Sequence, residues 1–330
     1  MAEPFLDPVG EAARVEAVLQ LPVPVVVEVG HSEMMRPMAP RVHLTNGVLA
    51  EVERELEADF ELVASPVGAD GVVAVLNVVI DDAYLEAAGP QLRIVANYAV
   101  GVNNIDLEAA RRRGIVISNT PDVLTGATAE VALTLMLSLL RRVTEGDRLI
   151  RRRDPWEFSL EFMLGESLAG KTVLIVGAGR IGRETARLVE AFGAHAVLAG
   201  RDADLDALLP QADIVSIHAP LTTETRHLID ARRLALMRPT AVLINTARGP
   251  VVDEAALAVA LQEGTIAGAG LDVYEHEPEV TEALLVLDNV VLAPHLGSAT
   301  RDTRIGMGML CVSALRAVLL EGRTPANVVA

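Results

Sequence analysis

Residues 172–182 read TVLIVGAGRIG, in which an apolar run leads directly into three spaced glycines. The run predicts a buried strand, and residues 180–192 predict a helix that ends at Gly193. In such a unit the first glycine permits a tight turn, the second lets a pyrophosphate approach the backbone, and the third lets helix pack on strand. Residues 177–182 therefore predict a dinucleotide-binding turn, in which the free N–H groups of the helix N-terminus face the anion.

The second strand of this unit, Ala196–Ala199, ends in Gly200 and Arg201. An acidic residue about 20 residues past the turn typically binds the 2′-hydroxyl of the adenine ribose. Here Gly200 leaves space, and the Arg201 guanidinium suits a 2′-phosphate, which favours NADP(H) over NAD(H). Two features oppose this prediction: Asp202 and Asp204 would repel the phosphate, and Arg201 is equally explained as a solvated loop residue.

Short β-rich runs alternate with helical stretches on both sides of the turn. The expected strands are 42–44, 71–76, 92–96 and 115–118 in a first series, and 172–176, 196–199, 214–217, 241–245, 266–273 and 290–293 in a second. Such alternation implies right-handed crossovers and parallel sheets. The fold class is therefore α/β, with two doubly wound parallel-sheet domains and a cleft between them.

The domain limits follow from this pattern. Residues 121–296 are expected to bind the dinucleotide, and residues 41–120 together with 297–330 to form the substrate domain. Residues 1–40 contain six prolines and are interpreted as an N-terminal extension, within which Met38 is an alternative start.

Composition narrows the class of protein. The 330 residues suit two domains of ~100–200 residues each, and 51% of them are hydrophobic. With 28 basic against 45 acidic residues the net charge is −17, which argues against binding nucleic acid or an anionic membrane. Cys311 is the single cysteine, which fits a reducing compartment, and we interpret it as a core residue. The apolar run Val131–Leu140 is shorter than the ~20 residues that span a bilayer, and a cytoplasmic location is expected.

Polar side chains follow three successive strands of the second series. Arg248 lies in NTARG after 241–245, Glu277 in EHEP after 266–273, and His295 in PHLGS after 290–293. The carboxyl ends of parallel strands are where ligands bind in such sheets. An arginine can grip a carboxylate, a histidine can move a proton near neutral pH, and a glutamate can orient that histidine. These side chains are the set needed to reduce a 2-oxo acid by hydride transfer.

At these residues the sequence resembles the D-isomer-specific 2-hydroxyacid dehydrogenase family, over residues 41–330. The motifs that carry the resemblance are NYAVGVNNID at 97–106, the glycine-rich turn, NTARGPVVD at 245–253, GLDV at 270–273 and PHLGS at 294–298. The first of these is most similar to the glyoxylate/hydroxypyruvate reductase branch. The resemblance places the catalytic residues on Arg248, Glu277 and His295.

The resemblance also implies roles. His295 exchanges a proton with the carbonyl oxygen as hydride moves from or to the nicotinamide, Glu277 pairs with His295, and Arg248 holds the substrate. The expected substrate-binding positions are Leu76, Val100 and Gly101 together with Arg248 and His295. The expected cofactor-binding positions are Gly177, Ala178, Gly179, Arg180, Ile181, Gly182, Gly200, Arg201, Ala219, Thr246, Asp272 and Gly297. Asp272 is expected to touch the nicotinamide carboxamide.

Other histidines lack such a setting. His31, His43, His195, His218 and His227 have no comparable neighbours in the sequence. His276 stands between two glutamates, but without a second His or Cys nearby we predict no metal site.

The sequence departs from the family in two places. The segment 201–212, which is expected to flank the adenosine, is shorter than the corresponding segment of the family. Phe162 stands where hydroxypyruvate-reducing members carry a tryptophan from the partner subunit. The family is typically homodimeric, and the helix from Thr125 and residues 151–170 are the expected dimer contacts; the apolar run in that helix fits plain core equally.

We therefore predict an NAD(P)H-dependent reductase of a small 2-oxo acid, glyoxylate or hydroxypyruvate, that forms the D-2-hydroxy acid. Two alternatives stay open at this point. One is a dehydrogenase for another D-2-hydroxy acid such as 3-phosphoglycerate. The other is an NAD(P)-sensing regulatory protein on the same fold, which would bind nucleotide without turnover.

Overall fold

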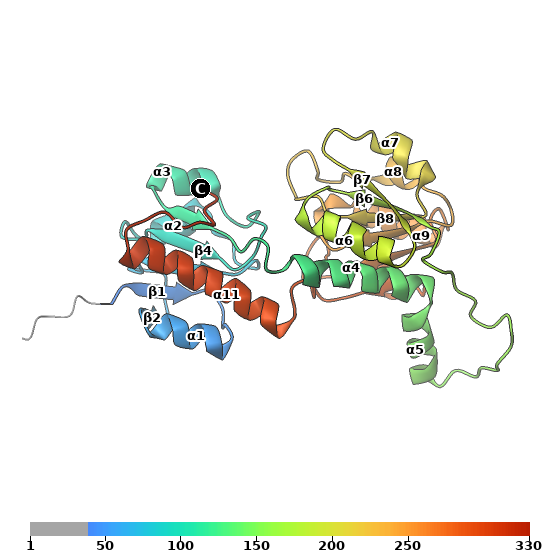
Figure 1. Ribbon diagram of the computed structural model, residues 1–330, viewed down its shortest axis with the longest axis horizontal. Coiled ribbons are helices and arrows are strands. Elements are labelled where there is room, and N and C mark those ends of the chain that lie inside the picture. Colours follow the sequence, from blue (N-terminus) through green and yellow to red (C-terminus); the bar gives the residue numbers. More distant parts are fainter. Residues whose placement is uncertain (1–38) are drawn as a thin grey trace, which may run out of the picture. The chain divides into compact units, whose positions relative to one another are not determined.

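The first sheet of the computed structural model contains five parallel strands in the order β2-β1-β3-β4-β5 (Figure 1). The strands are β1 Arg41–Leu44, β2 Glu61–Val63, β3 Gly71–Ala74, β4 Ile94–Asn97 and β5 Val116–Ser118. This is the flavodoxin-like order, with the chain reversing direction between β1 and β3. The structure describes residues 39–330, so the prediction of an extension over residues 1–40 lies outside the described residues except for its last two positions.

The helices of this first unit begin and end where local chemistry dictates. They are α1 Ala50–Glu57, α2 Asp82–Ala88, α3 Leu107–Arg113 and α11 Arg301–Leu315. Asp81 and Asp106 cap α2 and α3 by accepting hydrogen bonds from backbone N–H groups of the first turn. Gly114 ends α3 in the left-handed conformation at φ 69°, which glycine adopts without strain.

The terminal helix α11 packs against α1 and β4 (Figure 1). It continues into a π-helical turn, Arg316–Leu320. Within residues 39–330 this combined segment alone is long and apolar enough to cross a membrane, and 56% of it is buried inside the protein. Leu315 and Leu319 contact Gly71, and Cys311 is buried, as predicted for a core residue. The apolar character of the segment is therefore accounted for by the core beneath it.

The second sheet contains six parallel strands in the order β11-β10-β9-β8-β6-β7. They are β6 Thr172–Val176, β7 His195–Ala199, β8 Ile214–Ile217, β9 Val242–Asn245, β10 Gly268–Leu271 and β11 Val290–Leu292. The prediction of six parallel strands is confirmed. The chain reverses its direction of winding between β6 and β8, which is the point where ligands bind in sheets of this kind.

Helices α4 (Thr125–Leu140), α6 (Arg180–Ala191) and α9 (Glu254–Gln262) accompany the second sheet, with the short helices α7 Leu205–Leu208, α8 Ala231–Leu234 and α10 Glu282–Leu285. α4 packs on α6, β9 and β10. Gly270 permits this approach, because a Cβ atom there would lie 2.9 Å from Cβ of Leu135. Seven residues of α4 are buried. The apolar run 131–140 is thus largely core of this chain.

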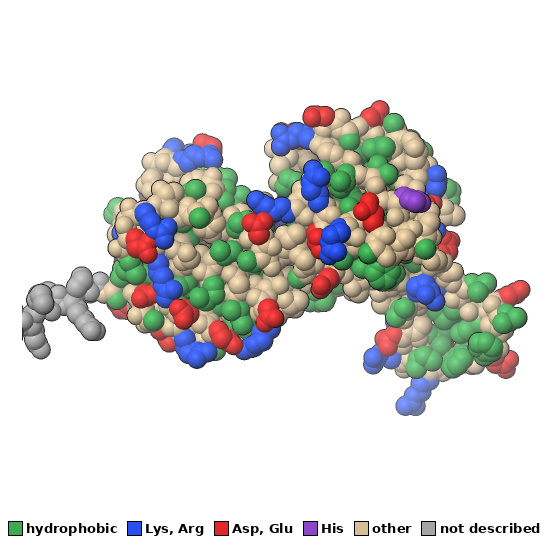
Figure 2. Space-filling view, in the orientation of Figure 1, with side chains coloured by type: hydrophobic (Ala, Val, Ile, Leu, Met, Phe, Trp, Pro, Cys, Tyr) green, Lys and Arg blue, Asp and Glu red, His purple; other side chains and the backbone are tan. Residues whose placement is uncertain are grey.

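Several elements were not expected from the sequence: strand β2, helices α5 (Val143–Arg152) and α9, and the short helices α7, α8 and α10. In addition, α11 begins at Arg301 rather than at Gly306. α5 is amphipathic but has no buried residue. We call residues 143–166 the arm; its apolar side chains gather on the surface as a green area at the lower right of Figure 2. Phe158 is 84% exposed and Leu160 is 87% exposed.

Candidate active site

His295 and Glu277 form a hydrogen-bonded pair at the carboxyl edge of the second sheet. His295 Nδ1 lies 2.8 Å from Glu277 Oε2, and both side chains are about one-third exposed. Burial raises the pKa of Glu277, but the hydrogen bond and charge of His295, the Tyr274 N–H and the charge of Arg248 together hold it below its usual value. The carboxylate is therefore ionised near neutral pH and fixes the ring orientation of His295.

The backbone of His295 is held by Asp272. The His295 N–H donates to the Asp272 carbonyl at 2.9 Å, and φ of His295 is +55°, in the left-handed region. The Asp272 carboxylate accepts from Leu296 N at 2.6 Å and from Gly297 N at 2.7 Å. Burial raises the pKa of Asp272, and these N–H groups counteract the rise. In this structure Asp272 thus orders the loop that carries His295.

Glu277 is fixed from its own loop. Its Oε1 accepts from Tyr274 N at 3.0 Å, and the Tyr274 hydroxyl donates to the Ala293 carbonyl at 2.9 Å. The tyrosine therefore ties the loop after β10 to the end of β11, which carries the histidine. Two neighbouring strand ends thereby bring the acid–base pair together.

Arg248 lies in the turn after β9. Its Nη1 donates to the Ala247 carbonyl at 2.6 Å and its Nε donates to Asn103 Oδ1 at 3.0 Å. Burial lowers its pKa, an effect that the charge of Glu277 opposes. Among residues 39–330 no carboxylate lies within 4.0 Å of this guanidinium. A partly buried cation without an ion-pair partner is a natural site for an anionic ligand.

The loop after β4 offers backbone donors. The carbonyls of Val100 and Gly101 accept from the side-chain amides of Asn119 at 2.9 Å and Asn97 at 2.7 Å. Their own N–H groups have no partner in the described part of the chain. Gly101 also lies against Arg248, because a Cβ atom at Gly101 would be 2.2 Å from Nη2. The two predicted carboxylate-binding positions thus adjoin the predicted arginine.

The glycine-rich turn fits a dinucleotide. A Cβ atom at Gly177 (φ +109°) would lie 2.6 Å from the His218 carbonyl carbon, and one at Gly182 would lie 2.1 Å from the Gly177 oxygen. A Cβ atom at Gly179 would meet nothing within 4 Å. The first and third glycines are therefore required by packing, and the second leaves open space at the N-terminus of α6, the position at which turns of this kind receive a pyrophosphate.

Other predicted cofactor positions have defined surroundings. Thr246 is buried and its hydroxyl has no partner within the described residues, while the Gly297 carbonyl accepts from Thr128 at 3.0 Å. Arg180 pairs with Asp122 at 2.8 Å on the surface. A Cβ atom at Gly200 would meet nothing within 4 Å. The pKa of Glu224 is lowered mainly by the hydrogen bond from Thr222, with a smaller contribution from the charge of Arg201. Ala178, Ile181 and Ala219 keep their predicted places in the turn and after β8, and Leu76 follows β3.

Sequence reasoning assigned no role to two groups that the structure places beside these residues. Asn103 stands inside the motif 97–106 but was not singled out. His227, for which the sequence shows no suitable neighbour, lies with its Nε2 2.7 Å from Glu275 Oε1. Only the tertiary fold brings residues so far apart in sequence together.

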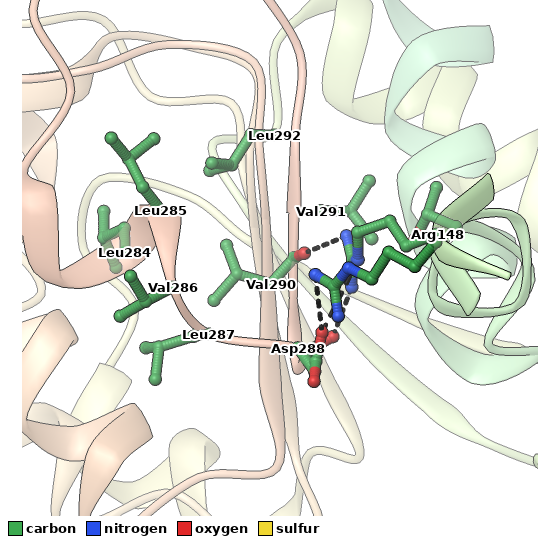
Figure 3. Close-up of a pocket in the computed structure, with 11 residues that line it drawn as sticks. Arg148, Leu284, Leu285, Val286, Leu287, Asp288, Val290, Val291 and Leu292 are labelled. Atoms are coloured by element: carbon green, nitrogen blue, oxygen red, sulfur yellow. Dashed lines mark hydrogen bonds and ion pairs between the residues drawn. The ribbon is translucent and has the colours of Figure 1, made fainter. Parts of the chain in front are cut away.

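His276 is exposed, and among residues 39–330 no group of three His, Cys, Asp or Glu side chains is arranged to hold a metal ion. A pocket of about 140 Å³ lies elsewhere, between α5 and the segment before β11 (Figure 3). Arg148 reaches across it to the Asp288 carbonyl at 2.8 Å, and apolar side chains 284–287 form the opposite wall. None of the predicted catalytic residues lines it.

A glycine-rich turn at a sheet reversal, with a His–Glu pair and an arginine on adjacent strand ends, defines an NAD(P)-dependent oxidoreductase. Residues 133–297 match the family model described as D-isomer specific 2-hydroxyacid dehydrogenase, NAD binding domain. The chain is 45% identical over 312 residues to a glyoxylate reductase of Thermococcus litoralis, covering 89% of this chain and 88% of that protein. It is 42% identical over 323 residues to a glyoxylate reductase of Pyrococcus furiosus, covering 88% and 96%.

Solved structures of related proteins have the same fold as this chain. A Thermus thermophilus protein superimposes with a TM-score of 0.83 at 40% identity, covering 88% of this chain and 100% of that one. The NADPH-dependent glyoxylate/hydroxypyruvate reductase of Sinorhizobium meliloti, in complex with NADP and malonate, gives a TM-score of 0.78 at 36% identity, covering 88% and 97%. The chain belongs to the D-isomer-specific 2-hydroxyacid dehydrogenase family.

Proposed function

We propose that this protein reduces glyoxylate, and with it hydroxypyruvate, to the corresponding 2-hydroxy acid in the cytoplasm, with NADPH favoured over NADH. The observation that carries the proposal is the His295–Glu277 pair on strand ends next to Arg248, a cation with no carboxylate partner within the described residues. The relatives named glyoxylate reductase support the choice of substrate.

The arrangement accounts for binding of a small 2-oxo acid. Arg248 donates hydrogen bonds to the protein through Nε and through one N–H of Nη1, so its remaining Nη protons can bind the carboxylate or carbonyl oxygen of the substrate. The N–H groups of Val100 and Gly101 supply further donors to the same carboxylate. Such preorganised donors cost no reorganisation at the moment of reaction.

Proton transfer falls to His295. Its Nδ1 is engaged by Glu277, so Nε2 is the nitrogen that remains to face the substrate. As the carbonyl oxygen gains negative charge, Nε2 donates a proton to it, and the Glu277 carboxylate stabilises the imidazolium before that transfer. When bound, the reduced nicotinamide supplies the hydride, and residues 177–182, Arg201, Thr246 and Asp272 are the groups proposed to hold it.

The first test follows absorbance at 340 nm with glyoxylate and hydroxypyruvate, each with NADPH and with NADH. Oxidation of NADPH well above NADH supports both the reductase and the assigned role of Arg201. Equal or NADH-favoured rates contradict the role of Arg201 alone. Nucleotide binding without oxidation by either acid contradicts the proposed substrates and favours a sensor or another 2-oxo acid.

We also propose that the chain forms a homodimer through the arm. The arm exposes Phe158 and Leu160 almost fully, and Trp156 stacks on Phe162 with ring centroids 5.9 Å apart. On a soluble protein, an exposed apolar surface of this kind marks a site of contact with another protein chain. Sedimentation should show a dimer at micromolar concentration, and Phe158→Glu combined with Leu160→Glu should shift it to monomer; a monomeric wild-type protein contradicts the proposal.

A further inference from the structure

The segment that carries Glu277 is anchored at both ends by one buried carboxylate. Glu254, the first residue of α9, accepts from Glu275 N at 2.8 Å through Oε2 and from Thr281 N at 3.0 Å through Oε1. Glu254 is only 6% exposed. The position of Glu277 along this segment therefore depends on how firmly residues 275–281 are held to the start of α9.

Glu275 returns the contact and adds a partner. Its Oε2 accepts from Glu254 N at 3.4 Å, and its Oε1 lies 2.7 Å from His227 Nε2. The Glu275 side chain is 16% exposed, and Arg226 lies at 3.9 Å from the same oxygen. The side chains of Glu254 and Glu275 thus hold each other's backbone N–H groups, and His227 is the side chain that makes a close hydrogen bond to Glu275.

His227 connects a third loop to the same place. Its backbone N–H donates to the Pro250 carbonyl at 2.8 Å, and the neighbouring Ile229 pairs with Val252 in a parallel bridge. Its φ is +50°, a conformation that costs a non-glycine residue free energy. The fold maintains this conformation at the position from which the imidazole reaches Glu275.

The loops of Arg248 and Glu277 are also in direct contact. A Cβ atom at Gly249 would lie 1.8 Å from the Tyr274 oxygen, so the backbone after Arg248 rests on the backbone before Glu275. Tyr274 N in turn holds Glu277 Oε1. A displacement of residues 274–277 is thereby transmitted to both predicted catalytic side chains.

We propose that His227 is a positioning residue, whose imidazole acts through Glu275 to hold the side chains of Glu277 and Arg248 in the positions that the reaction requires. In this role its side chain acts on Glu275 and not on the substrate or the cofactor. The inference rests on the proposed reduction. Because a misplacement of about 1 Å can cost about 10²-fold in rate, loss of the His227 hydrogen bond should lower kcat about tenfold.

His227→Asn is the decisive variant. Asparagine tolerates the left-handed backbone, yet its side chain is too short to reach Glu275 as Nε2 does. We expect kcat to fall about tenfold while the Kd of the nicotinamide cofactor stays unchanged. His227→Gln can reach Glu275 with an amide N–H and should regain most of the lost kcat. His276→Gln, an exposed change in the same segment as Glu277, is the matched control and should leave kcat unchanged.

A double-mutant cycle separates positioning from general damage. If His227 acts through Glu277, its substitution should cost less than threefold in a Glu277→Gln background, where the pair is already broken. A kcat of His227→Asn within twofold of wild type overturns the inference. So does a tenfold loss that is repeated in full on top of Glu277→Gln, or a failure of His227→Gln to recover activity.

Failure of the reaction itself is read separately. If the wild-type protein turns over no 2-oxo acid, the proposed function is refuted, and histidine 15N NMR still tests the positioning role. His227→Asn should change the Nδ1 signal of His295, because its bond to Glu277 is disturbed, whereas His276→Gln should not. An unchanged His295 signal in His227→Asn overturns the inference whatever the activity.

Discussion

The two sheets present different chemistry at their carboxyl ends. After β4, the first sheet offers backbone N–H groups of Val100 and Gly101, whose carbonyls are held by the side-chain amides of two asparagines. After β9 to β11, the second sheet offers Arg248, Glu277 and His295. The first arrangement suits recognition by fixed dipoles, and the second suits charge and proton transfer. Substitutions in the first sheet should therefore change KM, and those in the second should change kcat.

His295→Gln should give the largest effect. Glutamine preserves much of the shape but cannot supply the proton, and general acid catalysis contributes about 10²–10⁴-fold. We expect kcat for glyoxylate to fall about 10³-fold with the cofactor Kd, measured by nucleotide fluorescence, unchanged. A variant that retained a tenth of the activity would remove His295 from the role of acid.

Glu277→Gln should follow, with kcat lower by about 10–100-fold. The amide can still accept a hydrogen bond from Nδ1, but it no longer stabilises the imidazolium by charge. The measurement is kcat for glyoxylate, taken beside the cofactor Kd, which should not change. A kcat within twofold of wild type would show that the carboxylate does not assist His295.

The same carboxylate links stability to pH. The pKa of Glu277 in the folded protein is below its unfolded value, so its stabilisation is present above the unfolded pKa of about 4.3 and is lost as pH falls through the folded value. The difference in unfolding free energy between wild type and Glu277→Gln should therefore shrink as pH falls from 6 to 3. A difference that grew with acidity would contradict the sign of this pairing.

Gly101→Ala tests the loop of the first sheet at the point where it contacts Arg248. The new Cβ would lie 2.2 Å from Arg248 Nη2, so the guanidinium must move out of the position in which it is held. We expect the KM for glyoxylate to rise about tenfold, with a smaller change in kcat. Gly126→Ala, where a Cβ meets nothing within 4 Å, is the control. An effect confined to kcat would contradict the assignment of substrate binding to the first sheet and catalysis to the second.

Arg201→Ala should change only the choice of cofactor. We expect the preference for NADPH over NADH to fall about tenfold, or about 1.4 kcal/mol, with little change in the rate with NADH. Comparison of kcat/KM for the two cofactors measures it. Equal losses with both cofactors would place Arg201 outside the recognition of the 2′-phosphate.

Much of this division could be predicted from the sequence, because periodicity and glycine spacing report local structure. The six strands of the second sheet and the alternation of the first follow from such patterns, as does the appearance of Arg248, Glu277 and His295 at strand ends. Strand β2 has three residues and carried no clear pattern. The hydrogen bonds from Arg248 to Asn103 and from His227 to Glu275 join residues 145 and 48 positions apart, and no local pattern encodes them.

The left-handed backbone of His295, at φ +55°, lowers the stability of the fold at the residue proposed as the acid. A residue held in that region costs about 1–3 kcal/mol. Asparagine would occupy the position more comfortably than histidine, yet it could not serve as the acid. A selection for thermal tolerance alone would therefore favour asparagine at this position, whereas the proposed reaction requires histidine.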